Sequence, residues 1–171
     1  MAYATPLDLL KRIDADDLAR LCDRATPRTI DGDSLSGWLH SGAVAAKTSA
    51  AALTAAAAVI DAAINDADAE INGWLAARYP TPLSNPPLLI KRFAVEIAVY
   101  QLHRGNVTEA VENRYKHTVE SLKEISRGRM SLASDYPVVS SGGAMGAVQH
   151  SQARLTRVQS SPRVFGGGAG S

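Results

Sequence analysis

The stretch D-A-D-A-E-I-N-G-W-L-A-A-R-Y-P-T-P-L, from Asp66 to Leu83, decides the fold because it ends one long helix and imposes a turn before the next. Positions before and within it, apolar except for the last, recur at alternating steps of four and three, which predicts one stripe of a helix of about thirty residues. These positions are Leu53, Ala57, Ile60, Ile64, Ala67, Ile71, Trp74 and Arg78. The Tyr79-Pro80-Thr81-Pro82 run then stops the helix, because proline disfavours the helical conformation in the residue before it and lacks a backbone N–H.

Two short helices are predicted ahead of this element. Thr5-Pro6-Leu7-Asp8 combines an N-cap threonine, a proline at the first helical position and an acid near the helix dipole, so the first helix should run to about Ile13. Asp14 caps the second helix, which should end near Arg24. Its apolar side includes Cys22, for which we expect a small buried core residue and not a nucleophile.

Two more helices are predicted after the proline turn. Asn85-Pro86-Pro87 opens a helix that is apolar around most of its circumference until Gly105, which predicts a central position. The last helix should begin with Asn106 and Glu109 as a capping-box-like pair and end at Gly128. Its apolar side comprises Val111, Tyr115, Thr118, Leu122 and Ile125.

The opposite side of the last helix is charged. Glu112 and Lys116 are four residues apart, as are Lys116 and Glu120, which favours a face that is solvated or paired with a neighbouring subunit. The fold class is therefore all-α, an antiparallel helical bundle of about five helices.

Two segments fall outside these helices. Residues 25–49 are rich in Gly, Ser, Thr and Asp, which predicts a long loop with about one turn of helix. Trp38 in that loop either packs onto the domain's own core or anchors a neighbouring subunit. Residues 129–171 have four arginines and one acid, a charge of +3, whereas residues 1–128 have 14 basic and 16 acidic residues, a charge of −2. We predict a helical domain over 1–128 and an extended basic C-terminal arm over 129–171.

Composition favours association over catalysis. Aromatic residues make up only 5% of the chain, so an alanine-rich core should be thin and subunit association should add to its stability. The four histidines are scattered, and Asp66, Asp68 and Glu70 lack the Glu-x-x-His partners of a carboxylate metal site, so a solvated or interface acidic face is expected. We expect no catalytic, metal or cofactor site, and a soluble protein with no membrane segment.

Four stretches resemble a known family. They are M-A-Y-A-T-P-L-D-L-L-K-R, L-A-R-L-C-D-R, the Asp66–Leu83 stretch, and N-R-Y-K-H-T-V-E-S-L-K-E-I-S-R-G-R-M-S-L. With them, residues 1–132 resemble the Mu-like phage family of small neck proteins, related in architecture to the head-tail connector, or adaptor, proteins of long-tailed phages. The chain departs from that pattern at residues 32–49, which resemble an insertion, and in its long tail after Leu132.

The resemblance implies an all-α, ring-forming virion protein with no enzymatic activity. Such a ring, usually a dodecamer, lies under the portal protein and joins the capsid to stopper or tail completion proteins. Double-stranded DNA passes through its lumen without sequence specificity. The expected location is the virion neck at the head-tail junction, reached from the host cytoplasm during assembly.

Candidate contacts follow from this resemblance. We expect the last two helices to dock onto the portal or between subunits, and the arm to reach toward the next neck ring. The candidate subunit or partner interface is Trp38, Trp74, Arg78, Tyr79, Glu112, Lys116, Glu120 and Lys123. The candidate arm contacts are Arg154, Arg157, Arg163 and Phe165.

Other functions remain open at this stage. A stopper or tail terminator is another neck role, and those proteins are typically strand-rich. A small helical DNA-binding module is suggested by the basic tail, although the net charge of +1 argues against it. An enzyme with an acidic site ranks last and would show metal-dependent stability.

Overall fold

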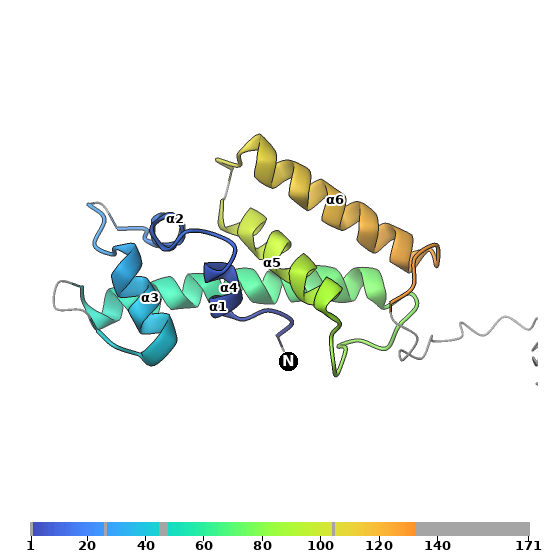
Figure 1. Ribbon diagram of the computed structural model, residues 1–171, viewed down its shortest axis with the longest axis horizontal. Helices are drawn as coiled ribbons and strands as arrows, with labels where there is room; N and C mark the ends of the chain where they lie inside the picture. The colour runs from blue at the N-terminus through green and yellow to red at the C-terminus, as the bar shows by residue number, and fades with distance from the viewer. Residues whose placement is uncertain (1, 26, 45–47, 104, 133–171) are drawn as a thin grey trace, which may run out of the picture. The chain divides into compact units, whose positions relative to one another are not determined.

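The computed structural model describes residues 2–25, 27–44, 48–103 and 105–132, and over these it contains six α-helices and no strand (Figure 1). The all-α class is confirmed. The predicted arm beyond Leu132, with Arg154, Arg157, Arg163 and Phe165, lies outside the described residues. The helices are α1 (Pro6–Leu10), α2 (Ala15–Cys22), α3 (Gly32–Ser41), α4 (Ala50–Leu75), α5 (Leu88–Leu102) and α6 (Glu109–Ser126).

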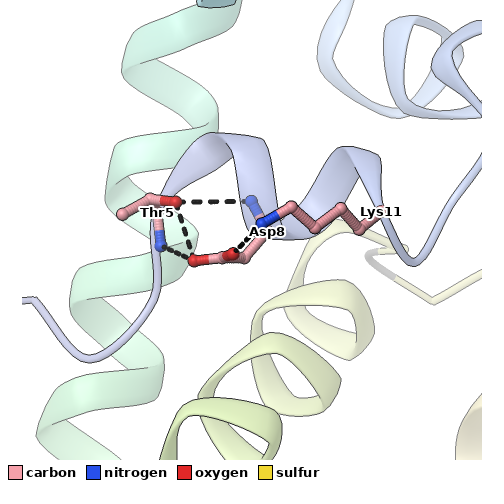
Figure 2. Close-up of polar contacts among 3 residues, drawn as sticks. All are labelled: Thr5, Asp8 and Lys11. Atoms are coloured by element: carbon pink, nitrogen blue, oxygen red, sulfur yellow. Dashed lines mark hydrogen bonds and ion pairs between the residues drawn. The ribbon is translucent and has the colours of Figure 1, made fainter.

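The start of α1 is a capping box, as its sequence predicts (Figure 2). The hydroxyl of Thr5 accepts a hydrogen bond from the backbone N–H of Asp8 at 3.3 Å, and the Asp8 carboxylate accepts one from the Thr5 N–H at 3.1 Å. Lys11 donates to the same carboxylate at 2.9 Å, and this bond holds the pKa of Asp8 below its usual value. The helix ends at Leu10, earlier than predicted, and a turn in which Arg12 and Ile13 donate to the carbonyl of Leu9 leads to Asp14, the N-cap of α2.

Helix α3 corrects the prediction of a long loop over residues 25–49. Its ten residues run from Gly32 to Ser41 between two well-formed ends. The side chain of Asp31 accepts a hydrogen bond from Ser34 N–H at 2.7 Å, and Gly42 ends the helix with a left-handed φ of 70°. Leu35 is fully buried, so packing outweighs the low helix propensity of the glycines and serines.

Helix α4 confirms the predicted long helix and its buried stripe. It begins at the N-cap Ser49 and ends at Leu75, just before the proline turn. Leu53, Ile60, Ile64, Ala67 and Ile71 are buried as predicted, whereas Ala57 and Trp74 are only partly buried and Arg78 lies beyond the helix.

By length and composition, α4 could also cross a membrane, with 26 residues and a hydropathy of 1.3. A core helix of a soluble protein passes the same test. The leucine and isoleucine side chains of α4 are all buried against the rest of the domain, and its exposed positions are mostly alanines, Asp61 and Asp66. The burial pattern therefore fits a core helix.

Helices α5 and α6 pack against α4 and against each other (Figure 1). The predicted central position of α5 is confirmed, because every residue from Phe93 to Val99 is buried. The predicted start of α6 is wrong: its N-cap is Thr108, not Asn106, and no side chain caps it. The predicted apolar side is confirmed, with Tyr115 partly buried and Val111, Thr118, Leu122 and Ile125 buried.

The polar residues of the Asp66–Leu83 stretch hold distant segments together. Asp68 is buried and accepts hydrogen bonds from the backbone N–H of Tyr3 at 3.1 and 3.2 Å. The Tyr3 hydroxyl donates to Asn72 and accepts from the backbone N–H of Leu83 at 2.9 Å. The N-terminal segment, α4 and the proline turn therefore meet at one tyrosine.

The same stretch also holds α6 and the chain that follows it. Glu70 accepts a hydrogen bond from the Tyr115 hydroxyl at 2.9 Å, and the Tyr79 hydroxyl accepts one from the backbone N–H of Leu132 at 3.2 Å. The prediction of a solvated or interface acidic face is therefore wrong for Asp68 and Glu70, whose carboxylates are acceptors within the domain.

Two glycines of α3 should respond oppositely to alanine. A Cβ atom at Gly32 would lie 2.5 Å from the backbone nitrogen of Asp16, so Gly32→Ala should lower the free energy of unfolding by about 1–3 kcal/mol. A Cβ atom at Gly37 would meet nothing within 4 Å, so Gly37→Ala should raise it by about 0.5–1 kcal/mol. Urea unfolding followed by circular dichroism measures both, and equal effects would contradict the close approach of α2 and α3.

Candidate interaction surfaces

Two of the predicted interface residues, Trp74 and Lys123, come together where α4 ends against α6, and a third, Arg78, follows four residues after Trp74. The ammonium of Lys123 lies 5.9 Å from the centroid of the Trp74 ring, a cation–π distance. Trp74, Arg78 and Lys123 are all partly exposed. We call these three residues the Trp74 surface. Whether a partner binds it stays a prediction.

Arg78 is packed more tightly than its exposure suggests. Its guanidinium lies 5.8 Å from the Tyr79 ring centroid, and a Cβ atom at Gly128 would fall 1.8 Å from its Nη1 atom. Its Nε atom is buried and has no hydrogen-bond partner among the residues that the structure describes. Gly128 has a φ of 78°, so glycine suits both the backbone conformation and the space here.

Tyr79 is not a surface residue, contrary to its place in the predicted interface. Its side chain is 2% exposed, and its hydroxyl accepts a hydrogen bond from the backbone N–H of Leu132. The proline after it turns the chain back over the end of α4, which places the ring in the core. Tyr79 therefore positions Leu132 instead of meeting a partner.

The predicted charged residues lie on the outer face of α6, but one of the two predicted ion pairs has a different partner. Lys116 pairs with Glu112 at 2.6 Å, and this hydrogen bond raises the pKa of Lys116. Glu120 lies 3.8 Å from Lys123 instead of pairing with Lys116. These side chains are largely exposed, so the face is open to solvent in the single chain.

Trp38 lies on α3 and packs against the domain's own core while remaining partly exposed. Of the two alternatives for this residue, packing onto the core is therefore confirmed. Helix α3 packs against α1, α2 and α4, and it lies toward the start of α4, whereas Trp74 belongs to the last turn of α4 (Figure 1).

Sequence reasoning missed a buried carboxylate. Glu96 lies within the apolar run of α5, is 5% exposed, and pairs with Arg12 at 2.5 Å and with Arg114 at 3.3 Å. It thus joins the chain after α1, α5 and α6. A single acid in an otherwise apolar helix is the signal that points to such a pairing, because a buried charge needs a partner.

A second missed feature is an apolar patch at the start of α5. Leu88 is 83% exposed, and Leu89 and Met130 are each 38% exposed. Leu89 and Met130 line a groove of about 400 Å³ between α5 and α6, which we call the α5–α6 groove. It is lined by Leu89, Arg92, Phe93, Glu96, Arg114, His117, Thr118, Ser121 and Met130.

The described part of the chain offers binding surfaces and no catalytic centre that we can identify. No three His, Cys, Asp or Glu side chains gather there as a metal site would require. Cys22 is buried, and burial raises its pKa to about 12, so its thiol stays protonated near neutral pH.

One protein family and two related proteins match this chain. The family described as "Bacteriophage Mu, Gp36" matches residues 3–148, a range that includes all six helices. "Gene product J" of Escherichia phage Mu is 35% identical over 103 residues, 60% of this chain and 67% of that protein. "Mu-like prophage FluMu protein gp36" of Haemophilus influenzae is 33% identical over 86 residues, 48% of this chain and 61% of that protein.

Removing the charge of Glu96 should destabilise the domain. Glu96→Gln weakens two charge-assisted bonds, but Arg12 and Arg114 are 40% and 44% exposed and can be hydrated, so we expect a loss of about 2 kcal/mol. Glu120→Gln, at an exposed pair, should change stability by less than about 0.5 kcal/mol. Urea unfolding of both variants makes the comparison. Equal losses would show that the Glu96 pairing adds nothing.

Alkaline pH should destabilise the domain through Tyr115. Burial and the bond to Glu70 raise the pKa of Tyr115 from 10.0 to about 12. Because the folded pKa lies above the unfolded one, this stabilisation is complete below pH 10 and is lost as pH rises toward 12. Tyr115 is partly exposed, so solvent screening reduces this contribution, and wild type should lose roughly 0.5 kcal/mol more than Tyr115→Phe by about pH 11. Parallel pH profiles of unfolding for the two proteins would contradict this.

Proposed function

Since the chain belongs to the bacteriophage Mu Gp36 family, we propose that it is a structural virion protein, a head-tail connector or adaptor. In this proposal its copies form a ring, a dodecamer, between the portal protein and the stopper or tail completion proteins. Genome DNA passes through the lumen without sequence-specific contacts. The ring occupies the neck of the virion and assembles in the host cytoplasm.

The observation that carries the proposal is the combination of an all-helical domain with exposed apolar surface at one place. Leu88, Leu89 and Met130 are three of the four large hydrophobic side chains that are exposed in the described part of the chain. Apolar side chains gathered on a surface mark protein contacts, because leaving them in water costs free energy. A subunit that acts only in an assembly has such surfaces.

The helical fold favours this role over the other neck roles. Stopper and tail terminator proteins are typically strand-rich, whereas the described residues between 2 and 132 form helices and no strand. This supports the connector as the first choice, with stopper or tail terminator as alternatives.

The charge of the domain supports a passive relation to DNA. Residues 1–128 have a charge of −2, which provides no excess of cations to neutralise phosphates. A lumen formed by such domains would let DNA pass without holding it. A DNA-binding module, the second alternative, would need its affinity from the three arginines beyond Leu132.

Within this proposal, the surfaces described above are assigned to contacts between subunits or with other neck proteins. The Trp74 surface and the charged face of α6, with Glu112, Lys116 and Glu120, are candidates for contacts between subunits or with the portal. The segment beyond Leu132 is the candidate for reaching the next neck component. No residue receives a catalytic role, and no cofactor is required.

The mass and symmetry of the purified protein test the proposal. Light scattering and particle imaging, alone and with the portal protein, should show rings, either free or only on the portal. Association into a ring is expected because the exposed apolar surface is then covered. A protein that stays monomeric in both conditions would contradict the connector role.

A truncation separates ring formation from tail joining. Deletion of residues 133–171 is preferable to deletion from Arg129, because Arg129 pairs with Glu124 at 2.7 Å and Leu132 is held by Tyr79. The truncated protein should form rings whose capsids fail to join tails in a complementation assay. A chain with residues 133–171 in scrambled order is the matched control for length and composition. Tailed infectious particles from the truncation would contradict the role of this segment in tail joining.

A further inference from the structure

The α5–α6 groove has an apolar floor at one end. Phe93, which is 7% exposed, lies at its base, and Leu89 and Met130 form its edges. Met130 belongs to the chain that follows α6, so the groove opens beside the last described residues. An apolar side chain that entered here would remove both its own surface and that of Leu89 and Met130 from water.

The rim of the groove is cationic. Arg92 is exposed and makes no ion pair or hydrogen bond within the described residues. Arg114 and His117 line the opposite wall on α6. The one carboxylate in the lining, Glu96, already accepts bonds from Arg12 and Arg114. The groove therefore favours an occupant with apolar side chains and a negative charge.

The chain itself provides such an occupant immediately after its last described residue. Residues 135–139 read Asp-Tyr-Pro-Val-Val, an acid followed by an aromatic and two aliphatic side chains. Asp135 is the only acidic residue after Glu124. The later apolar pair, Val164 and Phe165, follows Arg163 directly and would bring a positive charge to a cationic rim.

We propose that residues 135–139 bind in the α5–α6 groove of their own chain, with Asp135 beside Arg92 and the apolar side chains over Leu89, Phe93 and Met130. The segment covers the exposed apolar patch of a single subunit. A partner that binds the groove must displace it. This inference concerns one chain and does not depend on the connector role.

The length of the connection allows this binding. Five residue steps separate Met130 from Asp135, so the two Cα atoms are at most about 18 Å apart. Leu132 is fixed to Tyr79, which leaves Ala133 and Ser134 to turn the chain toward the groove. A tether this short gives the segment an effective concentration in the millimolar range, so weak contacts are sufficient.

Disulfide trapping in the full-length protein tests the proposal. Leu89→Cys combined with Val139→Cys should form an intrachain disulfide under mild oxidation, seen as faster migration without reductant and as a mass loss of about two hydrogens. Cys22 is buried with its pKa raised, so it can stay in place. The proposal is wrong if this pair forms no disulfide, or forms it only between chains.

Val44 offers a matched control for the first cysteine. It is 49% exposed and precedes the N-terminus of α4, whereas the groove lies along the helix that follows the C-terminus of α4. A helix of 26 residues is about 39 Å long, so the two sites are far apart. Val44→Cys with Val139→Cys should cross-link at least about tenfold more slowly. Equal rates for the two pairs would mean that residues 135–139 do not prefer the groove.

A charge exchange tests the contact between Arg92 and Asp135. In the Leu89/Val139 cysteine pair, Arg92→Glu or Asp135→Arg alone should slow trapping about two- to fivefold. The double exchange should restore the original rate, because it returns opposite charges to the two positions. Slowing that the double exchange does not reverse would overturn this contact. Circular dichroism checks that each variant keeps its helices.

Discussion

The tyrosine at position 3 is the contact on which the arrangement of the domain depends. Its backbone is bound by the buried carboxylate of Asp68, and its hydroxyl joins Asn72 of α4 to the backbone of Leu83 after the proline turn. Burial raises the pKa of the Tyr3 phenol and of the Asp68 carboxyl, so both groups are costly to bury without partners. The hydrogen bonds offset that cost only when all three segments are in place. The position of the turn, and with it the direction of α5, is therefore linked to the N-terminal segment.

Much of this fold could be predicted from the sequence, because the relevant signals are local. The caps at Thr5 and Asp14 and the stripe of α4 depend on neighbouring residues along one helix. Helix α3 could not be predicted in the same way, since glycine and serine disfavour helix and its stability comes from the burial of Leu35 and from Asp16, which accepts a bond from Gly32 at 2.9 Å. The start of α6 was misplaced for a related reason. Asn106 and Glu109 have the right spacing for a capping box, but the backbone becomes helical only after Thr108.

The surfaces were harder to predict than the core. A period of apolar residues indicates which side of a helix is buried, but it cannot show where neighbouring helices end. Helix α5 is buried on all sides from Phe93 to Val99, as its apolar sequence predicts. Leu88 and Leu89 at its start are exposed, although they are apolar too. The reverse error concerns Tyr79, which was expected at an interface and is held inside by the chain after α6. The burial of Asp68 and Glu96 could not be predicted, because it depends on pairings between segments that are distant in sequence.

These observations connect the composition of the chain to how it can associate. The core is built mainly from leucine and isoleucine, which corrects the expectation of a thin, alanine-rich core, and polar contacts such as those of Tyr3 and Glu96 add to the definition of the packing. Such contacts fix geometry more strongly than they add stability. Of the larger apolar side chains that remain exposed, Leu89 and Met130 line one groove, and Leu88 precedes Leu89 in the chain. The exposed start of α5, with Leu88 and Leu89, and its buried run from Phe93 to Val99 thus occupy different parts of the helix, with Glu96 inside the buried run.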